Sequence, residues 1–183
     1  MLLEIIIFIV VLFGAIFNNS VLWPCIFSWM VAQVIKIIIN LIVQKKFDIS
    51  RLWGDGGMPS GHSATVAALA TICGWGYGFS NALFGVAMIL MIIVTHDAVG
   101  VRREAGKHAV SIKLIAETIN HLINDKDDEI RTEKLKELVG HTPLQVFFGC
   151  LVGVLVTIVY CAIRGIGYES LYIAEIAQII KAF

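Results

Sequence analysis

The sequence predicts an all-α integral membrane protein, a bundle of about five transmembrane helices with an additional cytoplasmic or interfacial helical segment. Of its 183 residues, 58% are hydrophobic and only 15% are charged, and the mean hydropathy is +0.84. Soluble domains are usually about half apolar and about a quarter charged, so this composition favours the membrane class. The formal net charge is zero, which gives no reason to expect a nucleic-acid partner.

Five apolar stretches carry this prediction. They are Leu2–Phe17, Val21–Val43, His62–Phe79, Ala82–Thr95 and Pro143–Ile163. A helix needs about 20 residues, within a range of roughly 17–25, to cross the hydrocarbon core. The second, third and fifth stretches are long enough. The first and fourth are short, so we expect them to extend into flanking residues, to tilt little or to pack partly inside the bundle.

The positive charges lie mostly on one side of the predicted membrane. If the five stretches cross in turn, the segments Gln44–Gly61 and His96–Thr142 share a face. These two segments hold Lys45, Lys46, Arg51, Arg102, Arg103, Lys107, Lys113, Lys126, Arg131, Lys134 and Lys136. The opposite face carries Arg164 and, by its position, Lys181. Because short loops rich in Lys and Arg stay in the cytoplasm, we expect a multi-pass protein with this charged face cytoplasmic.

The segment between the fourth and fifth spans has structure of its own. Val110–Ile123 has helical apolar spacing and is expected to form the interfacial or cytoplasmic helix. Asn124–Glu129 is polar and predicts a loop. Arg131–Val139 predicts a short helix that stops at Gly140.

A glycine-rich run precedes the third apolar stretch. Residues Gly56–Ala64 read GGMPSGHSA, in which Pro59 and Ser60 suit the start of a helix. A helix N-terminus binds anions readily, and His62 would bring a titratable proton to such an anion. The alternative is a plain glycine-rich loop with a serine cap and a surface histidine.

Two further groups lie at the same predicted face. The first is His96–His108, which contains Asp97, Arg102 and Arg103; paired guanidinium groups suit a phosphate clamp, although they would also bind lipid headgroups nonspecifically. The second is Gly140–Pro143, where His141 precedes a span; taken alone, it indicates only a helix cap and an interfacial histidine.

Polar residues also interrupt the second apolar stretch. Gln33, Lys36 and Asn40 are three and four positions apart and therefore share one helix face. A lysine inside a span costs at least about 2.5 kcal/mol unless it is paired, so Lys36 is expected to face the bundle rather than lipid. The alternative is that its amine reaches the membrane interface. Histidines, an aspartate and several Arg and Lys residues at one face together suit phosphate-ester chemistry better than proton transport.

The motifs resemble a known family of phosphatases. GGMPSGHSA is similar to the PSGH signature of the type-2 phosphatidic acid phosphatase and vanadium haloperoxidase superfamily. The wider pattern resembles that superfamily's divergent small membrane branch through AQVIK, GGMPSGHSA, HDAVGVRREAG, LKELVGHTP and QVFFG, in this order. The resemblance covers residues 20–163 of one membrane domain, 1–183. It leaves residues 1–19 as an additional N-terminal helix and 164–183 as a C-terminal tail.

The resemblance implies a mechanism that needs no metal or other cofactor. In the parent superfamily one histidine attacks phosphorus and forms a phosphohistidine, a second protonates the leaving alcohol, and an aspartate orients the nucleophile. By this resemblance His62 is the general acid, and Ser60 and Gly61 form part of the phosphate cradle. The five residues between Arg102 and His108 match the third signature's spacing of arginine and nucleophile.

The sequence departs from the parent pattern at three places. Ile112 stands where the third signature has its aspartate, five rather than six residues separate Lys45 from Arg51, and Leu52 replaces the proline of the first signature. Members of the divergent branch often carry glutamine at the position of His108, whereas the Gly-His motif before proline recurs. His141 is therefore a candidate nucleophile that competes with His108, and the sequence favours His141. Asp97 is expected to orient either His62 or His141.

The sequence therefore predicts a membrane lipid phosphate phosphatase. Its expected substrate is a lipid phosphate such as phosphatidylglycerophosphate, with phosphatidate or a polyprenyl diphosphate as alternatives, and phosphate contacts are expected from Arg102, Arg103, Arg51, Lys36, Ser60 and Gly61. A non-catalytic lipid-phosphate binder or translocator is the rival from another class. A metal-dependent hydrolase using His62, Asp97 and His141 is the third alternative. The oligomeric state is left open, and a homo-oligomer is compatible with the sequence.

Overall fold

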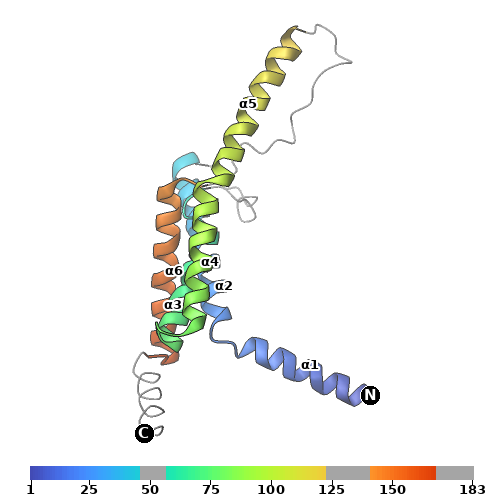
Figure 1. The fold of residues 1–183 in the computed structure, drawn as a ribbon, viewed down its shortest axis with the longest axis vertical. Helices are drawn as coiled ribbons and strands as arrows, with labels where there is room; N and C mark the ends of the chain where they lie inside the picture. The colour runs from blue at the N-terminus through green and yellow to red at the C-terminus, as the bar shows by residue number, and fades with distance from the viewer. Residues whose placement is uncertain (46–56, 123–140, 168–183) are drawn as a thin grey trace.

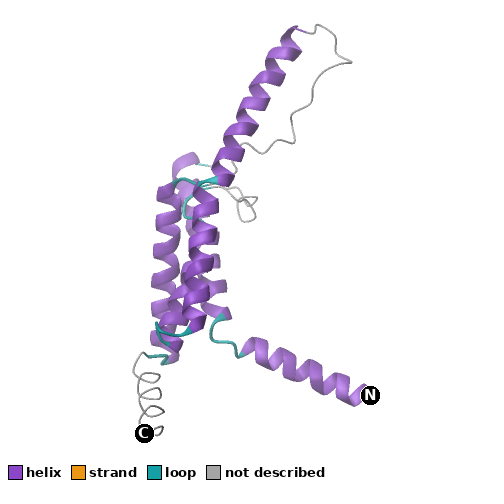
Figure 2. Cartoon of the chain, viewed as in Figure 1, coloured by secondary structure: helices purple, strands orange, loops and turns teal. Residues whose placement is uncertain are grey.

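The computed structural model is built from helices that match the predicted apolar stretches closely. It describes residues 1–45, 57–122 and 141–167. In order these residues form α1 (Leu2–Phe17), α2 (Leu22–Gln44), α3 (Gly61–Tyr77), α4 (Ala82–Val99), α5 (Val101–Leu122) and α6 (Pro143–Arg164). Within these ranges every regular element is a helix, as Figure 2 shows. The all-α membrane class is confirmed.

Helix α3 lies at the centre of a bundle with α2, α4 and α6. It packs against all three, and its inward residues are mostly glycine, alanine and serine. Small residues allow helix backbones to approach closely, which is how helices pack in a membrane, where lipid is as apolar as leucine. Figure 1 shows α2, α3, α4 and α6 side by side. The large apolar side chains of α2, α4 and α6, such as Val34, Ile89 and Leu155, face outward.

The closest approach is between α3 and α6. Gly149 and Gly153 of α6 face the backbone of α3: a Cβ on Gly149 would lie 2.5 Å from the Ser60 carbonyl oxygen, and one on Gly153 would collide with the Ala64 carbonyl. Ser60, Ser63 and Ala64 are themselves fully buried. This contact fixes the start of α3 against the first half of α6.

Helix α1 stands apart from this bundle, which the sequence did not predict. Its bounds are those expected, but it points away from the end of the bundle where α2 begins (Figure 1), and nearly all its residues are exposed. It is joined to α2 by a hydrogen bond from the Trp23 indole Nε1 to the Phe17 carbonyl, at 2.7 Å. Its one charged side chain, Glu4, pairs with the N-terminal ammonium at 3.1 Å, and its remaining surface of Ile, Val, Leu and Phe suits lipid as well as another helix. Four of the five expected helices therefore form the bundle.

Length and apolarity qualify three helical segments as membrane spans. They are Leu22–Val43, Ala82–Asn120 and Pro143–Arg164. The second has 39 residues, or about 58 Å at 1.5 Å per residue. The hydrocarbon core is only about 30 Å thick, so the charged part beyond Gly100 lies outside it. The fourth stretch thus extends into its flank as expected, whereas α3 is shorter than predicted, because it ends at Tyr77.

Candidate functional site

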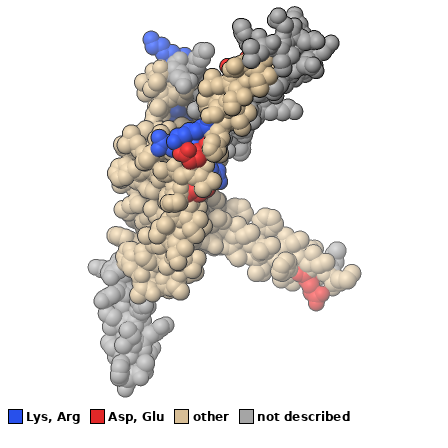
Figure 3. Space-filling model, turned by 45° about the horizontal axis from the view of Figure 1, so that its top comes forward, with Lys and Arg blue, Asp and Glu red and all other residues tan. Residues whose placement is uncertain are grey.

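The polar residues singled out from the sequence meet at one end of the bundle. The N-termini of α3 and α6 and the C-termini of α2 and α4 lie there, because α2, α3, α4 and α6 alternate in direction in this order along the chain. Figure 3 shows Lys and Arg side chains, with acidic ones beside them, gathered where α5 leaves this end. The predicted shared face is thus present in the described residues, and we call this region the charged end.

Ser60 caps helix α3 and is enclosed by the protein. Its Oγ accepts a hydrogen bond from the Ser63 N–H at 3.3 Å and another from the Ser63 hydroxyl at 3.0 Å. Its own N–H donates to the Gln145 carbonyl at 3.0 Å. The N–H groups of Gly61 and His62 have no acceptor within the helix, as is general for a first helical turn. They, rather than Ser60, are the backbone donors that a phosphate would meet.

His141 is held at the start of α6 by backbone and side-chain contacts. It is 4% exposed, and its N–H donates to the Ala98 carbonyl at 3.0 Å, next to Asp97. The following residue, Thr142, begins α6 with a capping box: its hydroxyl accepts from the Gln145 N–H while the Gln145 side chain accepts from the Thr142 N–H. His141, α4 and the start of α3 are thereby tied together through Gln145 and Ala98.

The Gln145 side chain also fixes the tautomer of His141. Gln145 Oε1 lies 3.2 Å from His141 Nδ1 and 3.0 Å from the Thr142 backbone nitrogen. A backbone N–H can only donate, so the atom facing both groups is the amide oxygen. His141 Nδ1 must then carry a proton and donate it, so in the neutral imidazole the lone pair is on Nε2. A nucleophilic imidazole needs this arrangement.

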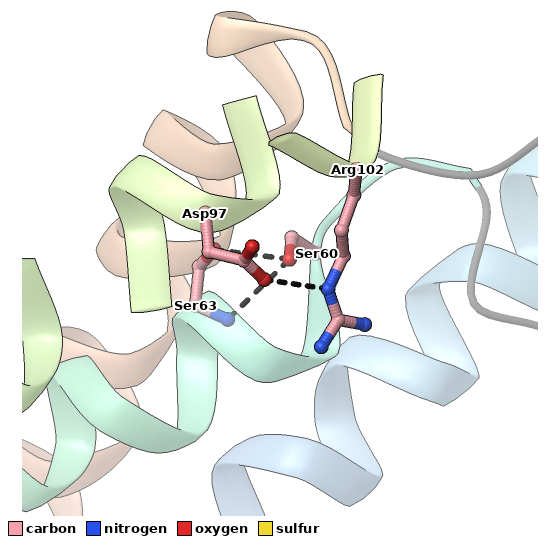
Figure 4. A network of polar contacts seen from close by, with 4 residues as sticks. All are labelled: Ser60, Ser63, Asp97 and Arg102. Carbon is pink, nitrogen blue, oxygen red and sulfur yellow. Dashed lines mark hydrogen bonds and ion pairs between the residues drawn. The ribbon is translucent and has the colours of Figure 1, made fainter. Parts of the chain in front are cut away.

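Asp97 binds Arg102 across the break between α4 and α5. Arg102 Nε lies 2.6 Å from Asp97 Oδ2, with the two side chains 47% and 38% exposed. An ion pair this exposed contributes at most about 1 kcal/mol to stability. The carboxylate uses only Nε, and Figure 4 shows the two terminal nitrogens of Arg102 turned away from Asp97. From the sequence, Asp97 was expected to orient a histidine. In the structure its hydrogen-bond partner is Arg102 instead.

Lys36 is enclosed in the bundle, not directed to lipid. It is 5% exposed, and its side-chain carbons pack at Gly57, where an added Cβ would lie 3.3 Å from Lys36 Cγ. Gly57 has φ of +99°, a conformation that favours glycine. Gln33 is buried beside it and lies near Gly61. The prediction that Lys36 faces the bundle is confirmed, and the interfacial alternative is wrong for this structure.

The other predicted residues are more exposed or fall outside the description. His62, Arg103 and His108 are exposed, His62 in the first turn of α3 and the other two on α5 beyond the bundle. Arg51 lies outside the described residues, as does the predicted helix Arg131–Val139.

The carboxylate of Glu104 is hydrogen-bonded to Lys107 rather than to His108. The Lys107 ammonium hydrogen-bonds to its carboxylate at 2.6 Å and holds the pKa of Glu104 below its usual value, against the opposite effect of burial. His108 acts on Glu104 only through its charge, which lowers the pKa of Glu104 less than Lys107 does, whereas the hydrogen bond of the carboxylate goes to Lys107. The geometry therefore favours His141 over His108.

Within residues 1–45, 57–122 and 141–167, no three His, Cys, Asp or Glu side chains lie close enough to share a metal ion. His62, Asp97 and His141, the proposed metal-binding set, are therefore not brought together as ligands here.

Sequence reasoning missed Gln145. The pattern Thr142-x-x-Gln145 before an apolar run is a capping box that is visible in the sequence. Its second role, fixing His141, follows only from the turn that brings residues 141 and 145 together. Ser63 was missed for a similar reason: its hydrogen bonds to Ser60 form only because α3 starts directly after Ser60.

The fold and the charged end together define a class: a small helical membrane protein with a polar, histidine-containing site at one end of its bundle. The chain belongs to the Divergent PAP2 family, whose model matches residues 17–156. It is 44% identical over 134 residues to the "Uncharacterized membrane protein YuiD" of Bacillus subtilis (strain 168), a match that covers 70% of this chain and 85% of the relative. No solved structure matches the chain.

Proposed function

We propose that the charged end is the active site of a lipid phosphate phosphatase that works through a phosphohistidine on His141. The observation that carries the proposal is the buried His141, whose Nδ1 is held by Gln145 while Nε2 keeps its lone pair. Arg102, Lys36 and the start of α3 supply positive charge and N–H donors at the same end. Membership of the Divergent PAP2 family supports phosphate chemistry at this site.

The proposed reaction has two displacements at phosphorus. His141 Nε2 attacks the phosphorus atom, a P–N bond forms, and the bond to the lipid oxygen breaks. The imidazolium of His62 gives its proton to the leaving oxygen. Neutral His62 then takes a proton from water, whose oxygen attacks phosphorus, breaks the P–N bond and releases phosphate. The terminal nitrogens of Arg102 stabilise charge on the phosphoryl oxygens.

The substrate is proposed to be the phosphomonoester or diphosphate of a membrane lipid. The site lies at the end of a bundle whose outer surface is apolar, where lipid headgroups are found. Phosphatidylglycerophosphate is the first candidate, with phosphatidate and polyprenyl diphosphates as the next.

One observation favours a non-catalytic binder or translocator as the second candidate. Asp97 binds Arg102, so an amide rather than a carboxylate holds His141. An amide stabilises the imidazolium less than a carboxylate would. Such a protein would bind the lipid phosphate through the same groups without hydrolysing it.

Phosphate release by the purified protein separates these functions. The assay uses a panel of the candidate lipid phosphates, with and without EDTA. We expect release from at least one lipid in EDTA. Release only without EDTA would favour a metal-dependent enzyme, and binding without release would favour the second candidate.

The charged end is further proposed to face the cytoplasm, from the excess of Lys and Arg. Ser80, in the turn between α3 and α4, lies at the opposite end and is exposed. In a variant without native cysteines, a cysteine at Ser80 should react with an impermeant thiol reagent in intact cells, whereas one at Arg103 should react only after lysis. The reverse pattern would contradict the orientation.

Arg102→Lys is expected to lower catalytic efficiency about 30-fold, on the order of the 2 kcal/mol carried by a charged hydrogen bond. An ammonium is a compact point charge, so it cannot hold Asp97 and also present the planar, two-pronged pair of donors to phosphate that a guanidinium does. Arg103→Lys, which alters a neighbouring arginine without an ion pair to Asp97, is expected to lose less. Steady-state kinetics on both variants measure these losses. A near-normal catalytic efficiency of the Arg102→Lys variant would show that Arg102 is a bystander.

A further inference from the structure

A second site lies at the opposite end of the bundle. A groove of about 520 Å³ opens between the end of α1, the start of α2 and the last turns of α6. The residues that line it include Phe17, Trp23, Phe27, Val156, Tyr160 and Arg164. The volume is within the roughly 300–1,000 Å³ of pockets that hold small ligands. Since α2 begins and α6 ends here, more than half of α6, from its start to Val156, separates the groove from His141.

Four aromatic rings form a continuous wall of this groove. The ring centroids lie 6.1 Å apart for Phe17 and Trp23, 5.6 Å for Trp23 and Phe27, and 6.2 Å for Phe27 and Tyr160. The indole Nε1 donates to the Phe17 carbonyl, so the polar atom of Trp23 is satisfied within the protein. The ring faces are then left for apolar contacts, such as those of an acyl chain.

Among the described residues that line the groove, Arg164 is the one that carries a charge. It is the last residue of α6 and is exposed, where a membrane span of 22 residues ends. Aromatic residues and basic side chains at such a position lie at the level of lipid headgroups. An apolar wall with one cation at its outer end matches a molecule with an apolar chain and an anionic head.

We propose that this groove binds an anionic phospholipid, with an acyl chain along the aromatic wall and its phosphate at Arg164. The proposal is independent of the proposed phosphatase site, because the two share no residue. The bound lipid would stabilise the junction of α1, α2 and α6.

Fluorescence of Trp23 tests this proposal. The probe protein retains Trp23, with Trp29, Trp53 and Trp75 replaced by phenylalanine, in bilayers of unlabelled phosphatidylcholine. Phosphatidylglycerol or phosphatidylcholine with brominated acyl chains is then titrated in at equal mole fractions. We expect brominated phosphatidylglycerol to reach half-maximal quenching at a mole fraction about five-fold lower than brominated phosphatidylcholine does. This factor corresponds to the attraction of one basic residue for anionic lipid near a membrane surface.

Variants at Arg164 distinguish a specific phospholipid site from nonspecific contact between interfacial aromatic residues and lipid. Arg164→Gln should remove the preference for phosphatidylglycerol while quenching by brominated phosphatidylcholine stays unchanged, which also shows that the groove is intact. Arg164→Lys should keep most of the preference. Lys107→Gln, which removes a positive charge on α5 beyond the charged end, should keep all of it. Equal quenching by both lipids, a preference that survives Arg164→Gln, or no quenching by either lipid would overturn the proposal.

Discussion

Replacing His141 with alanine is expected to abolish phosphate release, lowering the turnover rate by roughly 10³-fold or more, as removal of a catalytic nucleophile does. The backbone bond from residue 141 to Ala98 is kept in this variant, so the start of α6 should hold its place. His62→Ala is expected to be inactive as well, because the leaving oxygen then lacks its proton donor. Phosphate release by each purified variant measures both effects.

His108→Gln is the matched control for these two variants. His108 is exposed on α5, and its nearest candidate carboxylate, Glu104, is bound to Lys107. Its loss should leave roughly a tenth of the activity or more, because a tenfold loss is about 1.4 kcal/mol, no more than one charged hydrogen bond contributes. Thermal unfolding confirms that each variant is folded. An inactive His108→Gln with an active His141→Ala would reverse the assignment and favour the spacing of the parent superfamily.

Gly153→Ala is expected to destabilise the bundle by about 3 kcal/mol, near the upper end of the range for overpacked cores. At this chain length that corresponds to a fall in melting temperature of about 6–12 °C. The added Cβ would collide with the Ala64 carbonyl and lie 2.9 Å from Ala67 Cβ, so α3 and α6 must separate. Gly149→Ala should act similarly, and would also strain the bond from the Ser60 N–H to the Gln145 carbonyl.

Gly85→Ala is the control for this substitution. Gly85 also lies in a membrane helix, but a Cβ there meets no atom within 4 Å. Alanine is favoured over glycine in helices by about 1 kcal/mol, so the control should unfold at the same temperature or higher. Thermal unfolding in one detergent compares the three variants. Equal melting temperatures for Gly153→Ala and Gly85→Ala would contradict the close contact of α3 with α6.

The helices could be predicted because apolar runs of sufficient length leave few alternatives. The bounds of α1 are those expected, and those of α2 and α6 differ by one residue at each shifted end. The position of α1 could not be predicted, since beyond Glu4 in its first turn the helix is apolar on every side and has no preferred partner. The helical structure of residues 101–109, the first part of α5, was also missed, because charged residues after Asp97 resemble a loop.

The charged end was partly predictable. The burial of Lys36 follows from the cost of a lysine in a span, and that prediction is confirmed. The partners of His141 and Asp97 were not predictable, because each pairing depends on how one helix start meets its neighbour. Asp97 lies five residues before Arg102 and joins it only where α4 gives way to α5.

Trapping the phosphorylated protein tests the central claim most directly. The purified protein is mixed with a lipid substrate carrying radiolabelled phosphate, in EDTA, and quenched in alkali, in which phosphohistidine is stable. The proposed mechanism predicts labelled protein whose label maps to the peptide containing His141 and is absent from His141→Ala. Phosphate release from the same lipid with no labelled protein at any time of quenching, or label that persists in His141→Ala, would contradict it.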